Sequence, residues 1–283
     1  MLNSPRTSSE LYDRSTHCIL ELLQNADDNH YDDGILPTLT FTSEPGARTL
    51  RVDCNELGFE PENVEAISTV RHSTKSSKNN SHEYTGEKGI GFKSVYRIAD
   101  EVWISSRQYS FKFDKHQAFG MIAPVWAEFP ATVKPNLTSF FLKLAEECDQ
   151  DDLIKDLKSF DPHLLLFLRR IRKVEIQISE ANDCQWSQSL YKTTDSGQKY
   201  TITTLSSADT QQQFVTFEHT VLDLPPESRR SGISSSALTF AIPMGASQGD
   251  LLPGRQKVYA LLPISDYGLR VITHYSESED QLG

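Results

Sequence analysis

Glu21-Leu-Leu-Gln-Asn-Ala-Asp-Asp28 and Gly86-Glu-Lys-Gly-Ile-Gly-Phe-Lys-Ser94 are the two stretches that decide which fold we expect. The first continues an apolar pattern that predicts an amphipathic helix from about Ser8 to Asp28, with Glu21, Asn25 and Asp28 on its polar stripe. The second is a glycine-rich loop that precedes a predicted helix over Ile90 to Ala99. Together they predict a ligand-binding site formed by a helix and a glycine-rich loop, rather than a purely structural surface.

The residue types in both stretches suit nucleotide chemistry. A carboxylate such as Glu21 can deprotonate water, an amide oxygen such as Asn25 can ligate Mg²⁺, and Asp28 can join through water. Glycines let backbone N–H groups approach phosphate oxygens, the start of the next helix favours anions, and Lys88 and Lys93 supply positive charge. The spacing is neither GxxxxGK[ST] nor a GxGxxG directly after a strand, which disfavours a P-loop or dinucleotide fold. Taken singly, the two stretches also fit a solvated helix face and a turn that enters a helix.

The rest of the chain reads as alternating strands with few helices. We expect a hairpin of two strands after the first helix, a short helix over Glu62 to Ser68, and a mobile Ser-, Lys- and Asn-rich loop over Arg71 to Tyr84. Helical material is expected from about Asp151 to Ile171, broken near Pro162. Strands are expected at 38–42, 49–53, 101–106, 109–114, 139–144, 173–178, 200–205, 214–219, 237–242 and 258–262, and surface loops at 179–198 and 225–236. The pattern predicts an α+β domain over residues 1–283, with a motif core at 8–114 and an extension at 145–283.

Composition excludes several classes of function. The 283 residues carry a net charge of -11, so we expect no nucleic-acid partner, and the basic stretch Arg169 to Lys173 is interpreted as the solvated end of a helix. The four cysteines include no CxxC pair, which indicates neither a zinc site nor a disulfide framework and suits a reducing intracellular compartment, cytoplasmic or nuclear. The sequence contains no run of about 18 apolar residues, and its start has no apolar segment of the kind found in signal peptides. We therefore expect neither a membrane span nor a signal peptide. The eight histidines form no metal-spaced cluster, and His72 fits a surface loop.

Four motifs in a fixed order resemble the GHKL ATPases, the group of gyrase, the ATP-dependent heat-shock chaperones, histidine kinases and MutL. The likeness is greatest to the sacsin and NO VEIN branch, through Glu21 to Asp28, Asn55-Glu-Leu-Gly-Phe59, Ser73-Thr-Lys75 and Gly86 to Val95. It is dense over Leu11 to Asp100 and reaches later segments at 164–176 and 259–268. The resemblance implies a two-layer α/β sandwich, the Bergerat fold, with a mixed, mostly antiparallel sheet and helices on one face.

The same resemblance implies roles for individual residues. Glu21 would be the general base, Asn25 the Mg²⁺ ligand and Asp28 a support for the metal and its water. The adenine pocket would be shaped by Gly58 and Phe59, with the hydroxyl of Ser236 nearby. Ser73, Thr74 and Lys75 would border the lid and the nucleotide, and the triphosphate would be wrapped by Gly86, Lys88, Gly89, Ile90, Gly91, Phe92, Lys93 and Ser94.

One departure concerns the adenine end of the expected site. The Asp that accepts from the adenine amino group in the wider group falls on Cys54, which is a poor acceptor. The role then passes to Asp53 or Asn55, which face the same way on an alternating strand. Reduced affinity and relaxed base preference are both open outcomes.

The leading hypothesis is a Mg²⁺-dependent ATP-binding domain that hydrolyses ATP slowly and acts as a nucleotide-driven conformational switch or chaperone-like module. Nucleotide binding would then order the loop at 71–84, and this ordering would promote binding of a protein partner or of a second copy of the chain. The alternative is an interaction module that binds nucleotide without significant turnover. A histidine kinase is disfavoured, because no phospho-accepting helical hairpin precedes Glu21. The chain is expected to be either a short family member or a fragment of a larger protein.

Overall fold

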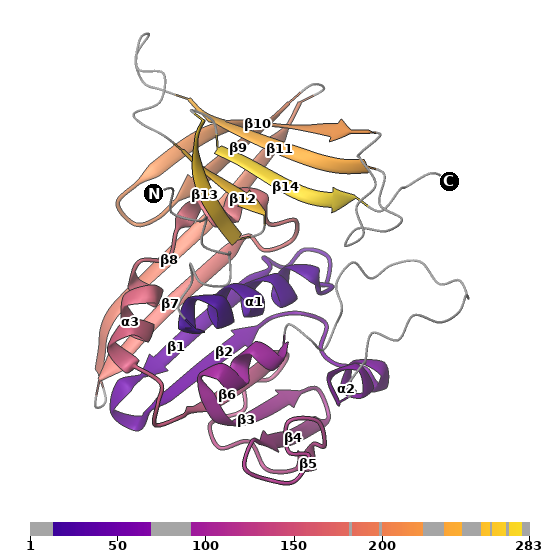
Figure 1. Cartoon of the computed structure of the whole chain (residues 1–283), viewed down its shortest axis with the longest axis vertical. Coiled ribbons are helices and arrows are strands. Elements are labelled where there is room, and N and C mark those ends of the chain that lie inside the picture. Colours follow the sequence, from indigo (N-terminus) through magenta and orange to yellow (C-terminus); the bar gives the residue numbers. More distant parts are fainter. Residues whose placement is uncertain are drawn as a thin grey trace, which may run out of the picture. The chain divides into compact units, whose positions relative to one another are not determined.

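The computed structural model describes residues 14–68, 92–180, 183–197, 200–222, 235–244, 256–260, 262–269 and 272–278. The chain divides into two compact units (Figure 1). Unit 1 contains Met1–Phe160 and Arg169–Ser189, and unit 2 contains Asp161–Leu168 and Leu190–Gly283. In the described residues the α-helices are α1 (Arg14–Asp28), α2 (Pro61–Ser68) and α3 (Gln150–Lys158), and the 3-10 helices are η2 (Pro45–Ala47), η3 (Phe92–Arg97) and η4 (Pro162–Phe167).

Helix α1 forms because its apolar residues recur at helical spacing. Its buried residues at 5% exposure or less are Ser15, Cys18, Ile19, Leu20, Leu22, Leu23 and Ala26. This i, i+3, i+4 pattern places one continuous stripe against the rest of unit 1, where α1 packs on α3 and η3. The predicted helix thus exists from Arg14 onward, and its first predicted residues lie outside the described part of the chain.

Unit 1 holds most of the strands whose register positions the site. These are β1 (Thr38–Glu44), β2 (Thr49–Cys54), β3 (Ala99–Ser106), β4 (Tyr109–Asp114), β5 (Val125–Trp126), β6 (Thr138–Leu144), β7 (Lys173–Glu180) and the first half of β8 (Asp183–Ser196). Strand β1 pairs antiparallel with β2 and parallel with β7, and β6 lies antiparallel between β2 and β3. The hairpin predicted after the first helix is therefore confirmed as β1 and β2.

The register of β1, β2 and β6 separates their side chains onto two faces. Leu39 pairs with Cys54, and Val52 pairs with both Phe41 and Phe140, so these residues share the face that meets α1. Residues one position along each strand point to the opposite face, since the side-chain period of a strand is two. Asp53, which pairs with Thr40 and Ser139, lies on that opposite face.

Unit 2 continues with strands on the C-terminal side of β8. They are β9 (Thr201–Ser206), β10 (Gln211–Val221), β11 (Ser235–Pro243), β12 (Gln256–Ala260), β13 (Leu262–Leu269) and β14 (Ile272–Ser278). Strand β10 pairs antiparallel with β9 and β11, and β14 pairs antiparallel with β11 and parallel with β12. The 3-10 helix η4 packs on β9.

The predicted two-layer α/β sandwich with helices on one face of its sheet is wrong. The fourteen strands of the described chain form one mixed sheet in the order β13-β12-β14-β11-β10-β9-β8-β7-β1-β2-β6-β3-β4-β5. Helices are few there, with α1, α2 and α3 containing 15, 8 and 9 residues. The sequence pattern located individual strands, but the pairing that joins them into one large sheet depends on contacts between distant residues.

Strand β8 shows why the pattern missed part of this sheet. The stretch 179–198 was expected as a surface loop because it is polar, yet β8 extends for 14 residues through it. Most of its described side chains are exposed or half-buried, so no apolar alternation marks the strand. Backbone pairing holds its second half to β9, from Tyr191 with Ser206 to Ser196 with Thr201.

Two helix predictions also change. Helical material over 151–171 is limited to α3 and η4, so the basic stretch from Arg169 to Arg172 is a connection before β7 rather than a solvated helix end. The predicted helix at 90–99 is the short 3-10 helix η3.

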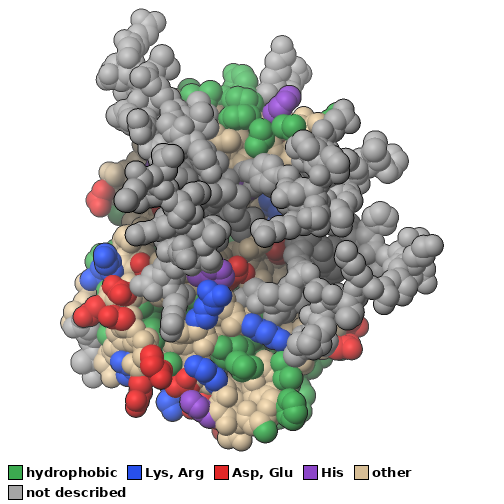
Figure 2. Space-filling model, in the orientation of Figure 1, with side chains coloured by type: hydrophobic (Ala, Val, Ile, Leu, Met, Phe, Trp, Pro, Cys, Tyr) green, Lys and Arg blue, Asp and Glu red, His purple; other side chains and the backbone are tan. Residues whose placement is uncertain are grey.

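Figure 2 shows acidic and basic side chains interspersed on the visible described surface. None of the helices in the described chain is long and apolar enough to cross a membrane.

Candidate functional site

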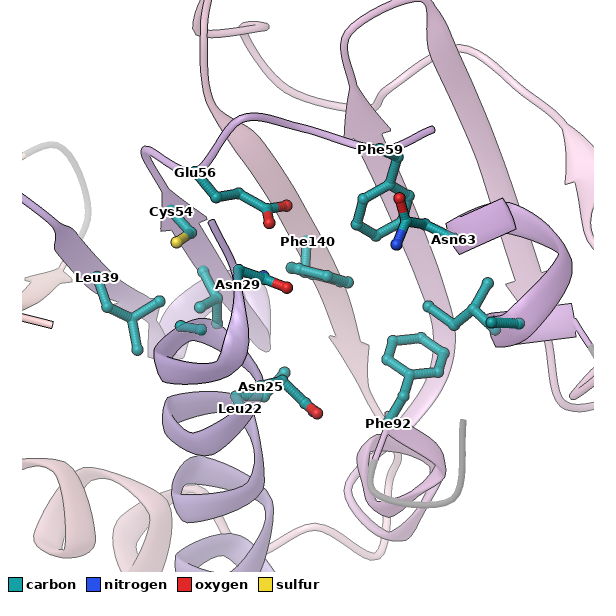
Figure 3. Close-up of a pocket in the computed structure, with 14 residues that line it drawn as sticks. Leu22, Asn25, Asn29, Leu39, Cys54, Glu56, Phe59, Asn63, Phe92 and Phe140 are labelled. Carbon is teal, nitrogen blue, oxygen red and sulfur yellow. The ribbon is translucent and has the colours of Figure 1, made fainter. Parts of the chain in front are cut away.

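A pocket in unit 1 lies between α1, the end of β2, α2 and η3 (Figure 3). The space between its walls is about 730 Å³, a volume that includes the open solvent at its mouth. Its lining residues are mainly apolar, with a few carboxamide and carboxylate groups: Leu22, Asn25, Ala26, Asn29, Leu39, Val52, Cys54, Glu56, Phe59, Asn63, Ala66, Ile67, Phe92 and Phe140. We call this the unit 1 pocket.

Helix α1 supplies one wall of the unit 1 pocket. Leu22, Asn25 and Ala26 follow the i, i+3, i+4 spacing of a single helix face, and Asn29, directly after the last residue of α1, continues that spacing, so all four reach the same space. Figure 3 shows the carboxamides of Asn25 and Asn29 pointing toward the cavity. Glu21 is not among the lining residues. Its side chain is 22% exposed, and its Oε1 lies 3.7 Å from Nε2 of His17.

Three phenylalanines form the aromatic part of the wall. The ring centroid of Phe140 lies 6.3 Å from that of Phe59 and 5.9 Å from that of Phe92. These separations suit tilted and edge-to-face aromatic packing. The backbone N–H of Phe59 donates to Oγ of Ser106 at 2.8 Å, which fixes this residue against β3. A flat aromatic or heteroaromatic group could pack on this surface.

Cys54 lies at the end of β2, and its thiol is hydrogen-bonded to a neighbouring side chain. The hydroxyl of Tyr31 lies 2.7 Å from the carbonyl oxygen of Ala26 and 3.1 Å from Sγ of Cys54. Since a carbonyl can only accept, the one hydroxyl proton of Tyr31 goes to Ala26, and the Cys54 thiol donates to the tyrosine oxygen. Burial, followed by the charge of Glu56, raises the pKa of Cys54 to about 12, so this thiol stays protonated.

Asp53 and Asn55, the expected alternatives to Cys54, do not line the unit 1 pocket. The carboxylate of Asp53 is 3% exposed and accepts from Arg51, Lys134 and Ser139 at 2.6 to 3.0 Å on the opposite face of the sheet. The Asn55 side chain accepts from the N–H of Thr38 at 2.7 Å and donates to the carbonyl of Leu36 at 2.9 Å. Asp53 therefore links β2 to β6, and Asn55 fixes the start of β1.

Gly58 allows the chain to turn from β2 toward α2. Its φ is +87°, and a Cβ at this position would lie 2.7 Å from Cγ of Arg107. The same arginine donates from Nε to the carbonyl oxygen of Leu57 at 2.6 Å. Glycine is thus required both by backbone conformation and by space, which explains the Gly-Phe pair of the second motif.

Asn63 faces the unit 1 pocket from the first turn of α2. Its Oδ1 accepts from the backbone N–H of Glu60 at 2.8 Å, an exchange typical of a helix start. This bond fixes the orientation of the carboxamide, so its NH₂ group points into the cavity, as Figure 3 shows. Nothing in the sequence pattern marked Asn63 as a site residue.

The C-terminal end of α1 is held by the connection that precedes β7. The buried carboxylate of Asp27 accepts the backbone N–H groups of Arg169, Arg170 and Ile171 at 2.7, 2.7 and 2.9 Å. Asp28, expected to support a metal ion, pairs instead with the guanidinium of Arg169. Asp27 is not among the predicted site residues, and its local sequence does not reveal its role, because its partners are 142 to 144 positions away along the chain.

The remaining predicted residues are distributed as follows. Phe92 lines the pocket, Lys93 is half-buried and Ser94 is buried, all three on η3. Ser236 is buried on β11 in unit 2. Ser73, Thr74, Lys75, Gly86, Lys88, Gly89, Ile90 and Gly91 lie outside the described residues. Among the residues that are described, no group of three or more His, Cys, Asp or Glu side chains could hold a metal ion.

Comparison with known proteins gives one clear relationship. No protein-family model matches the chain. The chain is 48% identical over 119 residues to Protein NO VEIN of Arabidopsis thaliana, which is 41% of this chain and 4% of that protein. It thus spans a small part of the length of this relative. Identity at this level over such a stretch confirms the predicted likeness to the NO VEIN branch, and the chain is homologous to Protein NO VEIN over that part of its sequence.

Proposed function

We propose that the unit 1 pocket binds an adenine nucleotide together with Mg²⁺. The observation that carries this proposal is the meeting of three sequence motifs in one cavity. Asn25 comes from the first motif, Glu56 and Phe59 from the second, and Phe92 from the C-terminal end of the glycine-rich fourth motif. Asn25 lies 31 positions before Glu56, and Phe59 lies 33 positions before Phe92. Chance placement of three expected nucleotide motifs around one pocket is a poor explanation.

The chemistry of the pocket fits the base of a nucleotide. Phe59, Phe92 and Phe140 offer aromatic surface, and Leu39 and Val52 are buried beneath the cavity. Carboxamides and one carboxylate in the lining can satisfy the polar edge of a purine. Phe92 directly follows the segment Gly86 to Gly91, whose glycines suit phosphate binding. A residue proposed to contact the base is therefore adjacent along the chain to the residues proposed to contact the phosphates.

Asn25 is the residue that would hold Mg²⁺. Its neutral carboxamide oxygen is a hard ligand, which suits an ion that keeps several waters and takes its other ligands from phosphate. The bound ion would neutralise charge on the phosphate oxygens. Glu21, one turn earlier on α1, would orient or deprotonate the attacking water.

A second candidate is nucleotide binding without significant turnover. The observation that favours it is the position of Glu21, which is outside the pocket lining and has Oε1 3.7 Å from Nε2 of His17. We propose slow hydrolysis as the primary activity, with a nucleotide-driven conformational switch as its use. Phosphate release by wild type and by Glu21→Ala separates the two candidates, because equal rates would select binding alone.

Titration calorimetry of the purified chain tests the binding proposal. Mg-ATP should bind to wild type, and Asn25→Ala should lose about tenfold or more of the Mg²⁺-dependent affinity. Gln24→Ala is the matched control, because Gln24 lies on the same helix but not in the pocket lining. Melting curves confirm that each variant is folded. Absence of nucleotide binding in wild type would refute the proposal.

A further inference from the structure

Strands β9, β10 and β11 of unit 2 bury one of their faces. On that face Phe214, Thr216 and Ala241 are at most 8% exposed, and the ring centroid of Phe214 lies 5.7 Å from that of His163 on η4. The 3-10 helix η4 also packs on β9. Side chains one position along each strand point to the opposite face, because the side-chain period of a strand is two.

The opposite face of these three strands is apolar. Their register places six apolar side chains next to one another on it: Ile202, Val215, Phe217, Leu238, Phe240 and Ile242. We call these residues the unit 2 apolar face. One row crosses the strands through Val215, and a second row contains Phe217 and Phe240, whose ring centroids are 5.1 Å apart.

Solvent reaches the unit 2 apolar face. All six side chains are partly exposed, and Phe217 is 39% exposed. Figure 2 shows hydrophobic side chains gathered on the visible surface over β10 and β11, which Figure 1 locates in the same orientation. An antiparallel sheet with one buried face commonly presents polar residues on its other face. A contiguous apolar surface in that place indicates an interaction site.

The exposed charges beside this face are acidic. Among the Asp, Glu, Lys and Arg side chains of the described residues 190–196, 200–222 and 235–244, the exposed ones are Asp195, Asp209 and Glu218. Asp195 lies next to Ile202 in the register of β8 and β9, at the margin of the unit 2 apolar face. The one lysine in these ranges, Lys192, is 6% exposed and donates to the carbonyl oxygens of Leu166 and Leu168 at 2.9 and 2.6 Å. The surface beside the face therefore carries negative charge.

This charge separates two kinds of occupant. A second copy of the chain would bring the same three acids toward this surface, and like charges across an interface oppose association. A partner that carries Lys or Arg beside an apolar surface would instead meet opposite charge. Charge complementarity thus favours a basic partner over a second copy.

The dimensions of the face suit a single helix. The two outer strands of three lie about 10 Å apart, and an α-helix with its side chains is about 10 to 12 Å wide. From Leu238 to Ile242 the face extends about 14 Å along β11, the length of about nine helical residues. A helix laid on a sheet is also a common arrangement for burying an apolar sheet face.

We propose that the unit 2 apolar face is the docking surface for a basic amphipathic helix of another protein. The apolar stripe of that helix packs on Phe217 and Phe240, and its Lys or Arg side chains lie beside Asp195. Burial of the two rings supplies affinity, and the acidic margin disfavours partners of negative charge. The surface belongs to unit 2, so this inference does not depend on nucleotide binding in unit 1.

Fluorescence anisotropy of a labelled peptide tests the proposal. The probe is a helical peptide of about 18 residues with Leu at i, i+3, i+4 and i+7 spacing and Lys on its other face. Wild type should bind this Lys peptide, and a matched peptide with Glu in place of Lys should bind at least about tenfold more weakly. Phe217→Thr should weaken binding of the Lys peptide about tenfold, since burial of a phenylalanine side chain is lost.

Two further variants separate the face from the rest of the chain. Phe119→Thr removes a phenylalanine of unit 1 that is 76% exposed, and it should keep the wild-type affinity. Asp195→Asn should weaken binding of the Lys peptide about twofold at low salt and have no effect at about 0.5 M NaCl, because exposed charges are screened. Asp195 is exposed, so this variant tests the surface even if Phe217→Thr does not fold.

Four results would overturn the proposal. Wild type might bind no Lys peptide at concentrations up to about 1 mM, where even weak docking is detected. The Glu peptide could bind as tightly as the Lys peptide, which would contradict a basic partner. Folded Phe217→Thr and Phe119→Thr could show equal affinity, which would place the peptide elsewhere. Finally, sedimentation equilibrium could show a wild-type dimer that Phe217→Thr lacks, and the occupant would then be a second copy of the chain.

Discussion

Asp27 offers the sharpest test of how the pocket wall on α1 is held in place. Its carboxylate is 6% exposed and accepts three backbone N–H groups, from Arg169 to Oδ2 and from Arg170 and Ile171 to Oδ1. These bonds attach the connection before β7 to the last turn of α1, two residues after Asn25. Water cannot replace a buried acceptor of this kind without rearrangement of the segment.

Replacing Asp27 with Asn should lower the free energy of unfolding by about 2 to 3 kcal/mol. The remaining amide oxygen can still serve two of the N–H groups, but the NH₂ group then faces the N–H of Arg169, so one charge-assisted bond is lost. Asp27→Ala leaves all three donors unsatisfied, and we expect a loss of about 3 to 5 kcal/mol. Urea unfolding followed by circular dichroism measures both variants, and a loss of 2 kcal/mol shifts the midpoint by about 1 M.

Asp28→Asn is the matched control, because it makes the same chemical change one residue later. Asp28 pairs with Arg169, whose side chain is 63% exposed, so a surface ion pair worth at most about 1 kcal/mol is lost. The slope of unfolding against urea should be the same in all variants. If Asp27→Asn and Asp28→Asn differ by less than about 0.5 kcal/mol, the anchoring role given to Asp27 is wrong.

Three further predictions concern separate features. Gly58→Ala should destabilise the chain more than Gly34→Ala, since both glycines have positive φ but only Gly58 would meet Arg107, and equal losses of about 1 kcal/mol in urea would contradict this. Burial lowers the pKa of His274 to about 4, against 6.5 in an unfolded chain, so stability is full above about pH 6.5 and falls as the pH drops toward 4. His274→Phe should remove about 3 kcal/mol of that loss near pH 4, and melting curves that decline equally in both proteins would refute it. Because burial raises the pKa of Cys54 to about 12, iodoacetamide at pH 8 should alkylate it only after denaturation, and rapid labelling of native protein by peptide mass spectrometry would be the contrary result.

Local patterns predicted the elements whose signals lie within one segment. The 3.6-residue apolar period of α1 and the alternation of β1 and β2 are properties of neighbouring residues, so the chain reports them directly. The motif residues Asn25, Phe59 and Phe92 were chosen from sequence, and all three line the unit 1 pocket.

The sheet and the rest of the pocket could not be read in this way. Strand β8 is polar along most of its length, and its place beside β7 and β9 is set by backbone pairing with residues far away. Asn63 and Phe140 enter the pocket from α2 and β6, and neither belongs to a motif. Residues of this kind are recognised only when the chain is folded, since no local rule links them.

The sequence by itself determined that α1 is amphipathic, that β1 and β2 form a hairpin, and which motifs could serve a nucleotide. Strand alternation also placed Asp53 and Cys54 on opposite faces, because adjacent side chains in a strand point in opposite directions. Which of those faces meets α1 was decided only by the tertiary structure. Packing of β2 between β1 and β6 turns Cys54 toward the unit 1 pocket and Asp53 toward Arg51 and Ser139. That one choice of face, made by long-range packing, places Cys54 rather than Asp53 in the lining of the unit 1 pocket.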